Sequence, residues 1–128
     1  MIYLLLISPS KDSFSVLVST LSKHDDVKTV FAESGESGLE LASVTFFNLV
    51  VIDENLGDMT GLEFAHKLLS VNPVTNCAIV SPLSKKEFHE ASEGLGVLTQ
   101  LPPFPGTKEV EDMVQMLRKI IMLSSGTG

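Results

Sequence analysis

Asp53 is the residue best placed for chemistry in this chain, because it ends a run of apolar residues. The stretch Asn48–Asp53 is predicted to be a strand buried on both faces, as in a parallel sheet. A carboxylate at the carboxyl end of such a strand lies where open α/β sheets hold their ligands and reaction sites. The plainer alternative is that Asp53 only caps the strand end and accepts hydrogen bonds from loop amides.

Five strands alternating with five helices would position this carboxylate. The predicted strands are Ile2–Ile7, Lys28–Ala32, Asn48–Asp53, Cys77–Ser81 and Val97–Leu101. The predicted helices are Asp12–Lys23, Ser34–Val44, Thr60–Val71, Lys85–Glu93 and Lys108–Leu123, with Ser34 and Thr60 as N-caps. This alternation predicts an α/β fold with right-handed crossovers, a flavodoxin-like (βα)5 three-layer sandwich with a parallel sheet of order 2-1-3-4-5.

Length and charge restrict the possible functions. The 128 residues are expected to form one domain over residues 1–123, followed by a linker-like tail at 124–128. A net charge of -7 argues against binding to nucleic acid or to anionic membranes. The first apolar stretch is too short for a signal peptide, and the single cysteine, Cys77, cannot form an internal disulfide. We therefore expect a cytoplasmic protein.

The predicted strand order brings several loops to one edge of the sheet. The first strand is followed by Ser8, Pro9 and Ser10, the fourth ends at Ser81, and the fifth is followed by Pro102. These residues are expected to surround Asp53, since the carboxyl ends of parallel strands meet at one edge.

The motif around Asp53 resembles that of a known family. The pattern Asp53-x-Asn55-Leu56-x-x-Met59-x-Gly61 is similar to the phosphoacceptor strand and following loop of the receiver domains of two-component response regulators, and the resemblance covers essentially the whole chain. It implies the CheY-like fold. It also implies that Asp53 corresponds to the phosphorylated aspartate, that the Asn55 carbonyl corresponds to a magnesium ligand, and that Ser81 corresponds to the switch hydroxyl.

Three departures from the family pattern put phosphorylation in doubt. Ser8 and Pro9 stand where receivers have two acidic residues, Pro102 stands where they have a lysine, and Thr99 stands at the position of the switch aromatic. Magnesium prefers several anionic oxygen ligands, and here only Asp53 supplies one. Proline offers neither a charge nor an N–H to a phosphoryl group. We therefore expect no metal or other cofactor. If the protein is instead a divergent receiver that is still phosphorylated, Asp53 and Asn55 are weak candidates for magnesium ligands.

The residues that replace the acidic pair could form a different site. Ser8, Ser10, Lys11 and Ser13 surround the predicted start of the first helix, where amide groups and the helix dipole favour anions. Two alternatives remain open: helix capping by Ser10 or Asp12, and an ion pair between Lys11 and Asp53.

Other polar residues have plainer explanations. Glu54 and Asp58 are expected to be solvated loop acids, with Glu54 as an alternative second cation ligand. His24, His66 and His89 lie on separate predicted helices without ligand spacing, so surface or helix-end positions are favoured over a metal site.

Three hypotheses follow. The first is a pseudo-receiver, without enzymatic activity, that acts as a protein-interaction module in two-component or phosphorelay signalling. Its partner would be a sensor kinase, an output domain, another signalling protein, or a second copy bound through the helix at 85–93, the strand at 97–101 and the helix at 108–123. The residues expected on that face are Lys85, Phe88, His89, Thr99, Gln100 and Met116. The second hypothesis is a divergent receiver phosphorylated on Asp53, and the third is a flavodoxin-like binder of a small anion near Ser8–Ser13.

Overall fold

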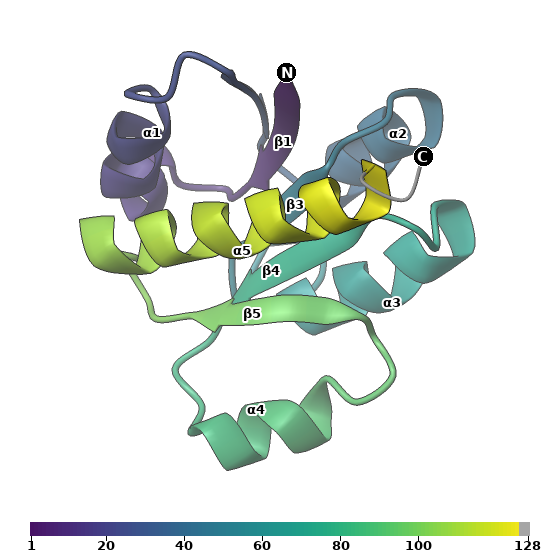
Figure 1. Ribbon diagram of the computed structural model, residues 1–128. Coiled ribbons are helices and arrows are strands. Elements are labelled where there is room, and N and C mark those ends of the chain that lie inside the picture. Colours follow the sequence, from purple (N-terminus) through teal and green to yellow (C-terminus); the bar gives the residue numbers. More distant parts are fainter. Residues whose placement is uncertain (126–128) are drawn as a thin grey trace.

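Strands and helices alternate throughout the computed structural model, which describes residues 1–125 (Figure 1). The strands are β1 (Ile2–Ile7), β2 (Val27–Ala32), β3 (Leu49–Ile52), β4 (Asn76–Val80) and β5 (Val97–Leu101). The helices are the 3₁₀ helix η1 (Lys11–Phe14) and the α-helices α1 (Ser15–Leu21), α2 (Gly35–Val44), α3 (Gly61–Val71), α4 (Lys85–Ala91) and α5 (Thr107–Ser125). No helix within this part of the chain is long and apolar enough to span a membrane.

The strands form one parallel sheet in the order β2-β1-β3-β4-β5, which confirms the predicted fold. Every residue of β3 is buried, as its run of aliphatic side chains predicts for a central strand covered on both faces. Asp53 follows immediately, and its backbone N–H donates to the carbonyl oxygen of Ile7 at 3.0 Å. The aspartate is therefore fixed to the end of β1 as well as to β3.

Alternate residues of each strand pack into two separate cores. Leu6, Val51 and Val80 face the side of α1 and α5, where Phe14 and Met113 complete the core. Figure 1 shows α5 crossing this face of the sheet. The other side is covered by α2, α3 and α4, and its core has these members among others: Ile7, Ile52, Phe64, Ile79 and Phe88.

Side-chain caps fix where three helices begin. Ser34 accepts a hydrogen bond from the Ser37 N–H at the start of α2. Thr60 and Glu63 form a reciprocal capping box at α3, and Ser84 with Glu87 forms another at α4. Each capping box binds two backbone N–H groups at its helix start and Ser34 binds one, which explains the sharp starts predicted at Ser34 and Thr60.

The largest difference from the sequence prediction is at the first helix. The segment Lys11–Phe14 is a 3₁₀ helix, and the α-helix begins only at Ser15 and ends at Leu21 instead of Lys23. At the other end of the chain, α5 continues two residues beyond the predicted end at Leu123. Residues 126–128, part of the predicted tail, lie outside the described residues.

Candidate functional site

Asp53 and Ser8 form the centre of the carboxyl edge of the sheet. Asp53 is half-buried, Ser8 is fully buried, and the Ser8 hydroxyl lies 2.7 Å from Asp53 Oδ2. The other carboxylate oxygen, Oδ1, accepts a hydrogen bond of 2.8 Å from the Glu54 N–H. The same serine oxygen accepts from the Ser10 N–H at 3.1 Å. The Ser8 hydroxyl also lies 2.8 Å from the carbonyl oxygen of Ser10, so Ser10 and Asp53 are both acceptors within reach of its single hydrogen.

The loop between β3 and α3 is closely packed against the sheet. Leu56 is buried, and the Asn55 side chain accepts from the Gly57 N–H, closing a turn in which Gly57 has φ +87°. A Cβ at residue 61 would collide with the carbonyl oxygen of Asp53, so the start of α3 needs glycine there. The motif that resembles a phosphoacceptor loop therefore also has a structural reason for its residue types.

Asp58 binds the start of α2. Its two carboxylate oxygens accept hydrogen bonds of 2.9 Å from the N–H groups of Gly35 and Glu36, and these bonds, the one from Glu36 first, lower the pKa of Asp58. The Met59 side chain packs against Gly35, where a Cβ would overlap it. Asp58 is exposed, as expected for a solvated loop acid, and its carboxylate in addition binds the first amides of α2.

The segment after β1 does not pair with Asp53 through Lys11. Lys11 Nζ lies 5.5 Å from the centre of the Phe31 ring, on β2, which is a cation–π arrangement. Ser10 is at the N-cap position of η1 without a side-chain hydrogen bond there, and Asp12 lies inside η1, so neither acts as the expected cap. Ser13 also lies within η1, and Pro9 is exposed beside it.

This geometry weighs against an anion site over Ser8–Ser13. The hydroxyl of Ser8 faces the Asp53 carboxylate, and Lys11 lies over Phe31. An anion bound at Ser8 would lie close to the negatively charged Asp53 carboxylate, and the Lys11 ammonium group is directed to Phe31 instead. The repulsion between the anion and the carboxylate would therefore oppose binding.

The ends of β4 and β5 form the other part of this edge. Ser81 is buried, and its hydroxyl oxygen accepts from the Leu83 N–H at 3.2 Å. After β5, Pro102 and Pro103 are exposed and Phe104 is 71% exposed with φ +52°. This connection offers no side-chain cation at position 102, where the resemblance calls for one.

The oxygen atoms around Asp53 are poor ligands for Mg²⁺. Ser8 offers a neutral hydroxyl whose short contact is with the carboxylate itself, and the Asn55 carbonyl would be a second neutral oxygen. Glu54 is exposed and lines a small depression at the foot of the loop after β4. Among residues 1–125 there is no group of three or more His, Cys, Asp or Glu side chains that could hold a metal ion.

The remaining titratable groups of interest lie away from Asp53. His24 Nε2 is 2.6 Å from Glu111 Oε1, and Arg118 forms a bidentate ion pair with Asp26 that lowers the pKa of this aspartate to about 2. These contacts join the α1–β2 connection to α5. Burial raises the pKa of the Cys77 thiol to about 11, in keeping with the predicted position in a core strand.

Most residues of the predicted interaction face lie wholly or partly at the surface, with one exception. Lys85 and His89 are exposed on α4, Thr99 and Gln100 are half-buried on β5, and Met116 on α5 is 41% exposed. Phe88, in contrast, is only 6% exposed and packs into the core beneath α4. As the large apolar side chain of a short helix, Phe88 is needed to hold the helix on the sheet.

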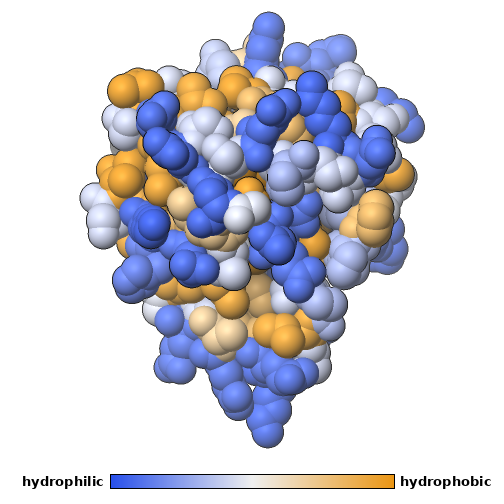
Figure 2. Space-filling model, turned by 180° about the vertical axis from the view of Figure 1, so that it is seen from behind, coloured by the Kyte–Doolittle hydropathy of each residue, from blue (hydrophilic) through white to orange (hydrophobic). Residues whose placement is uncertain are grey.

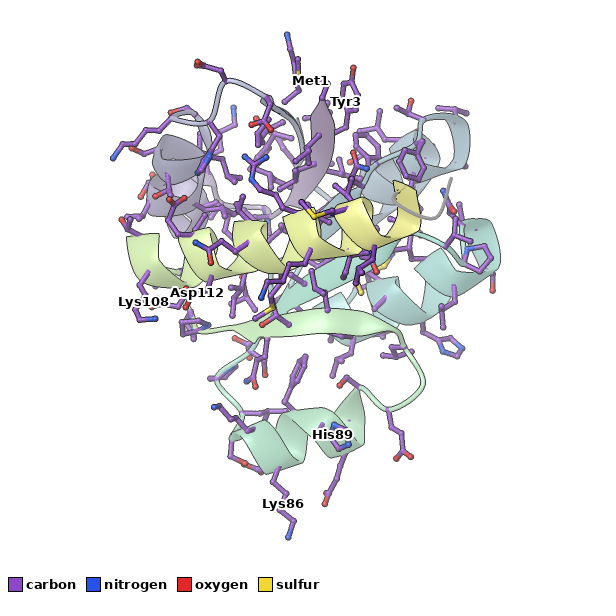
Figure 3. The ribbon with its side chains drawn as sticks, viewed as in Figure 1. Met1, Tyr3, Lys86, His89, Lys108 and Asp112 are labelled. Atoms are coloured by element: carbon purple, nitrogen blue, oxygen red, sulfur yellow. The ribbon has the colours of Figure 1, made fainter. Side chains whose placement is uncertain are left out.

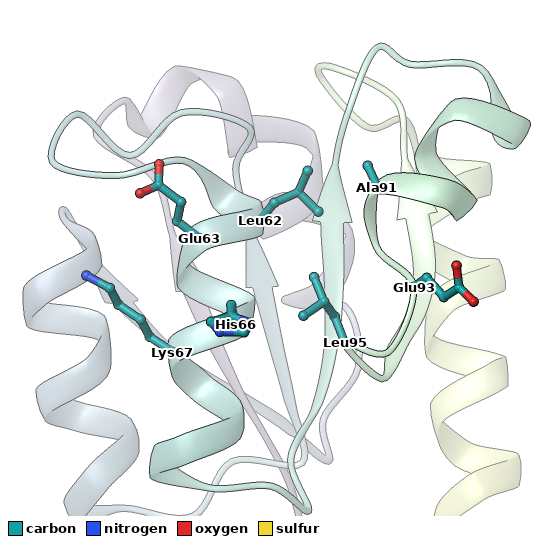
Figure 4. Close-up of a pocket in the computed structure, with 7 residues that line it drawn as sticks. All are labelled: Leu62, Glu63, His66, Lys67, Ala91, Glu93 and Leu95. Carbon is teal, nitrogen blue, oxygen red and sulfur yellow. The ribbon is translucent and has the colours of Figure 1, made fainter.

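Two hollows lie on the α3 and α4 side of the molecule. A groove of about 450 Å³ lies between α3 and the region of α4, with Leu62 and His66 of α3 on one side and Leu95 on the other (Figure 4). A depression of about 220 Å³ lies between the loops after β3 and β4, bordered by Thr60, Leu62 and Ser81. Neither hollow is lined by Asp53 or Ser8.

The comparisons with known proteins agree with the fold. No family model and no curated protein matches the sequence. Among solved structures, a CheY-like response regulator receiver domain protein from Methanospirillum hungatei JF-1 has a TM-score of 0.79 at 18% identity, covering 100% of this chain and 99% of that one. The chemotaxis response regulator CheY4 of Vibrio cholerae has a TM-score of 0.80 at 19% identity, covering 91% of this chain and 98% of that one.

A third solved structure is from a family of streptococcal redox sensors described as evolved from two-component response regulators. Its TM-score is 0.81 at 19% identity, and the match covers 98% of this chain but only 55% of the sensor chain. The chain thus spans about half the length of that protein. Taken together, the sheet order and these matches establish that this chain has the fold of CheY-like response regulator receiver domains.

Proposed function

We propose that this protein is an atypical receiver domain of two-component-type signalling that binds a protein partner without being phosphorylated. It would act as a signalling module and not as an enzyme. The proposal combines the receiver fold with a carboxyl edge whose chemistry differs from that of a phosphoacceptor site.

The observation that carries the proposal is the contact between Ser8 and Asp53. A buried serine hydroxyl lies 2.7 Å from the carboxylate at a position where the resemblance calls for a metal-binding acid. Phosphorylation of a carboxylate develops negative charge beside an existing anion, so it depends on cations to offset that charge. A neutral hydroxyl bonded to the aspartate stabilises the unmodified anion instead.

The β5–α5 connection supports the same proposal from the other side. Pro102 stands at the position of the family's lysine and is exposed in a segment with two further prolines and Phe104. A cation at this position pairs with phosphoryl oxygens as a point charge. Its replacement by proline removes that stabilisation, and no side-chain rotation can restore it.

The surface most suited to a partner is the face formed by α4, β5 and α5. Its exposed members combine the Lys85 ammonium group and the His89 imidazole on α4 with the apolar Met116 on α5. Figure 3 shows Lys86 pointing away from the body of the molecule at the outer side of α4. A partner protein, or a second copy of this chain, could contact these side chains without any change at Asp53.

The proposal is tested by incubating the protein with Mg²⁺ and acetyl phosphate and recording its intact mass. We expect no addition of a phosphoryl group to the unmodified sequence, and the same result for the control Asp53→Asn. A variant with Ser8→Asp, Pro9→Asp and Pro102→Lys rebuilds the charges that the resemblance calls for, and we expect it to gain one phosphoryl group on Asp53. If the unmodified sequence is phosphorylated on Asp53, the divergent, phosphorylated receiver replaces this proposal.

A further inference from the structure

A bulge in β5 decides which of its residues faces α4. Cys77 pairs with Val97 and Ala78 pairs with Thr99, so Leu98 is an extra residue in the ladder. Register partners in a parallel sheet point to the same face. Ala78 belongs to the core on the α1 and α5 side, which places Thr99 on that side. Gln100, as the partner of Ile79, therefore lies on the side of α4.

Gln100 binds the connection between β4 and α4. Its Nε2 atom donates to the carbonyl oxygen of Ser81 at 3.1 Å and to that of Leu83 at 2.8 Å. The two N–H groups of a side-chain amide match two carbonyl acceptors, whereas the flipped amide would set its oxygen against both of them. The Leu83 N–H in turn donates to the Ser81 hydroxyl, so this connection is held at three points.

The helix that follows has few other anchors. Among the residues of α4, all of which the structure describes, Phe88 is the buried one. Figure 1 shows α4 beyond β5, joined to the sheet by a connection at each end, and the lower end of Figure 2, where α4 lies, is largely hydrophilic. After α4 in the sequence come Gly94 and Gly96, which both have positive φ and contribute no side chain to the packing of the helix.

From these contacts we infer that Gln100 is the positioning residue that holds α4 against β5 in one arrangement. Phe88 anchors the middle of the helix, and the Gln100 amide anchors its entry through Ser81 and Leu83. The functional consequence of this inference rests on the proposed function. The Gln100 amide would hold the face formed by α4, β5 and α5 in the arrangement that binds the partner, and phosphorylation of Asp53 would not be needed.

The test is amide hydrogen exchange of the full chain with Gln100→Leu, which keeps a side chain of similar size but removes both donors. We expect the amides of residues 83–92 to exchange about tenfold faster or more, as the loss of two neutral hydrogen bonds predicts. The amides of β1, β3 and α5 should keep their protection, because a general loss of stability would accelerate them as well. Unchanged exchange over residues 83–92 would overturn the inference.

Two further variants make the result specific. Thr99→Val is the matched control, since its hydroxyl reaches only the Gln100 carbonyl at 3.4 Å, and we expect unchanged exchange. Gln100→Glu at pH 7 turns a carboxylate toward two carbonyl oxygens, so it should accelerate the same amides even if Gln100→Leu does not fold. All variants are measured without acetyl phosphate. Phosphorylation of Asp53 would therefore overturn the proposed function and leave the assignment of Gln100 intact. Unchanged hydrogen exchange in both Gln100 variants would overturn the assignment of Gln100 and leave the proposed function intact.

Discussion

The loops that follow β3 and β5 lie at the same edge of the sheet but differ in how they are held. The β3–α3 loop buries Leu56, binds the start of α2 through Asp58, and packs so closely that only glycine fits at position 61. The β5–α5 connection exposes Pro102 and Phe104, with Phe104 in a left-handed backbone conformation. The β3–α3 loop is thus held in place by packing and by hydrogen bonds, whereas the exposed connection at Pro102 is not constrained in this way.

The strongest test of this contrast is Leu56→Ala. Removing a fully buried leucine leaves a cavity, so we expect the free energy of unfolding to fall by about 2–5 kcal/mol. Urea denaturation followed by circular dichroism measures the change. A loss below about 1 kcal/mol would mean that the loop can rearrange and that it is not an integral part of the core.

The next test is a double-mutant cycle of Ser8→Ala and Asp53→Ala. A hydrogen bond between a hydroxyl and a carboxylate is worth about 1.5–3 kcal/mol, and the two residues lie in direct contact. We expect Ser8→Ala to destabilise the protein clearly in the presence of Asp53 and much less in its absence. Additive effects of the two substitutions would contradict the account of the site, because they would show that the carboxylate does not depend on this serine.

A smaller effect is expected from Asp58→Asn, which weakens the cap of α2. The loss should be about 0.5–2 kcal/mol near neutral pH. Because the folded-state pKa of Asp58 is lowered, its stabilisation is present above the unfolded-state pKa and is lost as the pH falls through the folded-state value. The stability difference between the two proteins should therefore shrink below about pH 4.

The matched control for Asp58 is Glu54→Gln, which removes one negative charge from another exposed side chain of the same loop. Its effect should stay within about 0.5 kcal/mol at any pH between 4 and 8. Equal effects of the two substitutions would assign the role of Asp58 to the net charge of the protein instead of to the amides of Gly35 and Glu36.

The smallest effect is expected in the β5–α5 connection, from Phe104→Asn. Asparagine tolerates the left-handed region better than phenylalanine, and little buried surface is lost because the ring is largely exposed. We predict unchanged stability or a gain of up to about 1 kcal/mol by thermal or urea unfolding. A loss comparable with that of Leu56→Ala would remove the contrast between the two loops.

The sequence was sufficient to predict the architecture because its signals are local. Aliphatic runs of strand length marked β1 and β3, and cap residues such as Ser34 and Thr60 marked helix starts. The position of Asp53 followed from strand order alone. These features need no knowledge of distant partners.

The site details that were missed depend on partners far along the chain. Asp58 caps a helix that begins 23 residues earlier, and no local pattern marks this. The bulge at Leu98 shifts the register of β5, so that Gln100 and not Thr99 faces α4, and no local pattern in the sequence marks this bulge. The burial of Phe88 could have been predicted, since a short helix with one large apolar side chain must turn it to the sheet.

We propose that Asp53 is part of the packed structure and is not a working phosphorylation site. The most direct measurement is the amide NMR spectrum of the protein with Mg²⁺ and beryllofluoride, which mimics a phosphoryl group on an aspartate. We expect unchanged amide shifts for residues 53–61 and 81–92. Mg²⁺-dependent shifts centred on Asp53 and extending to Ser81 and α4 would contradict it.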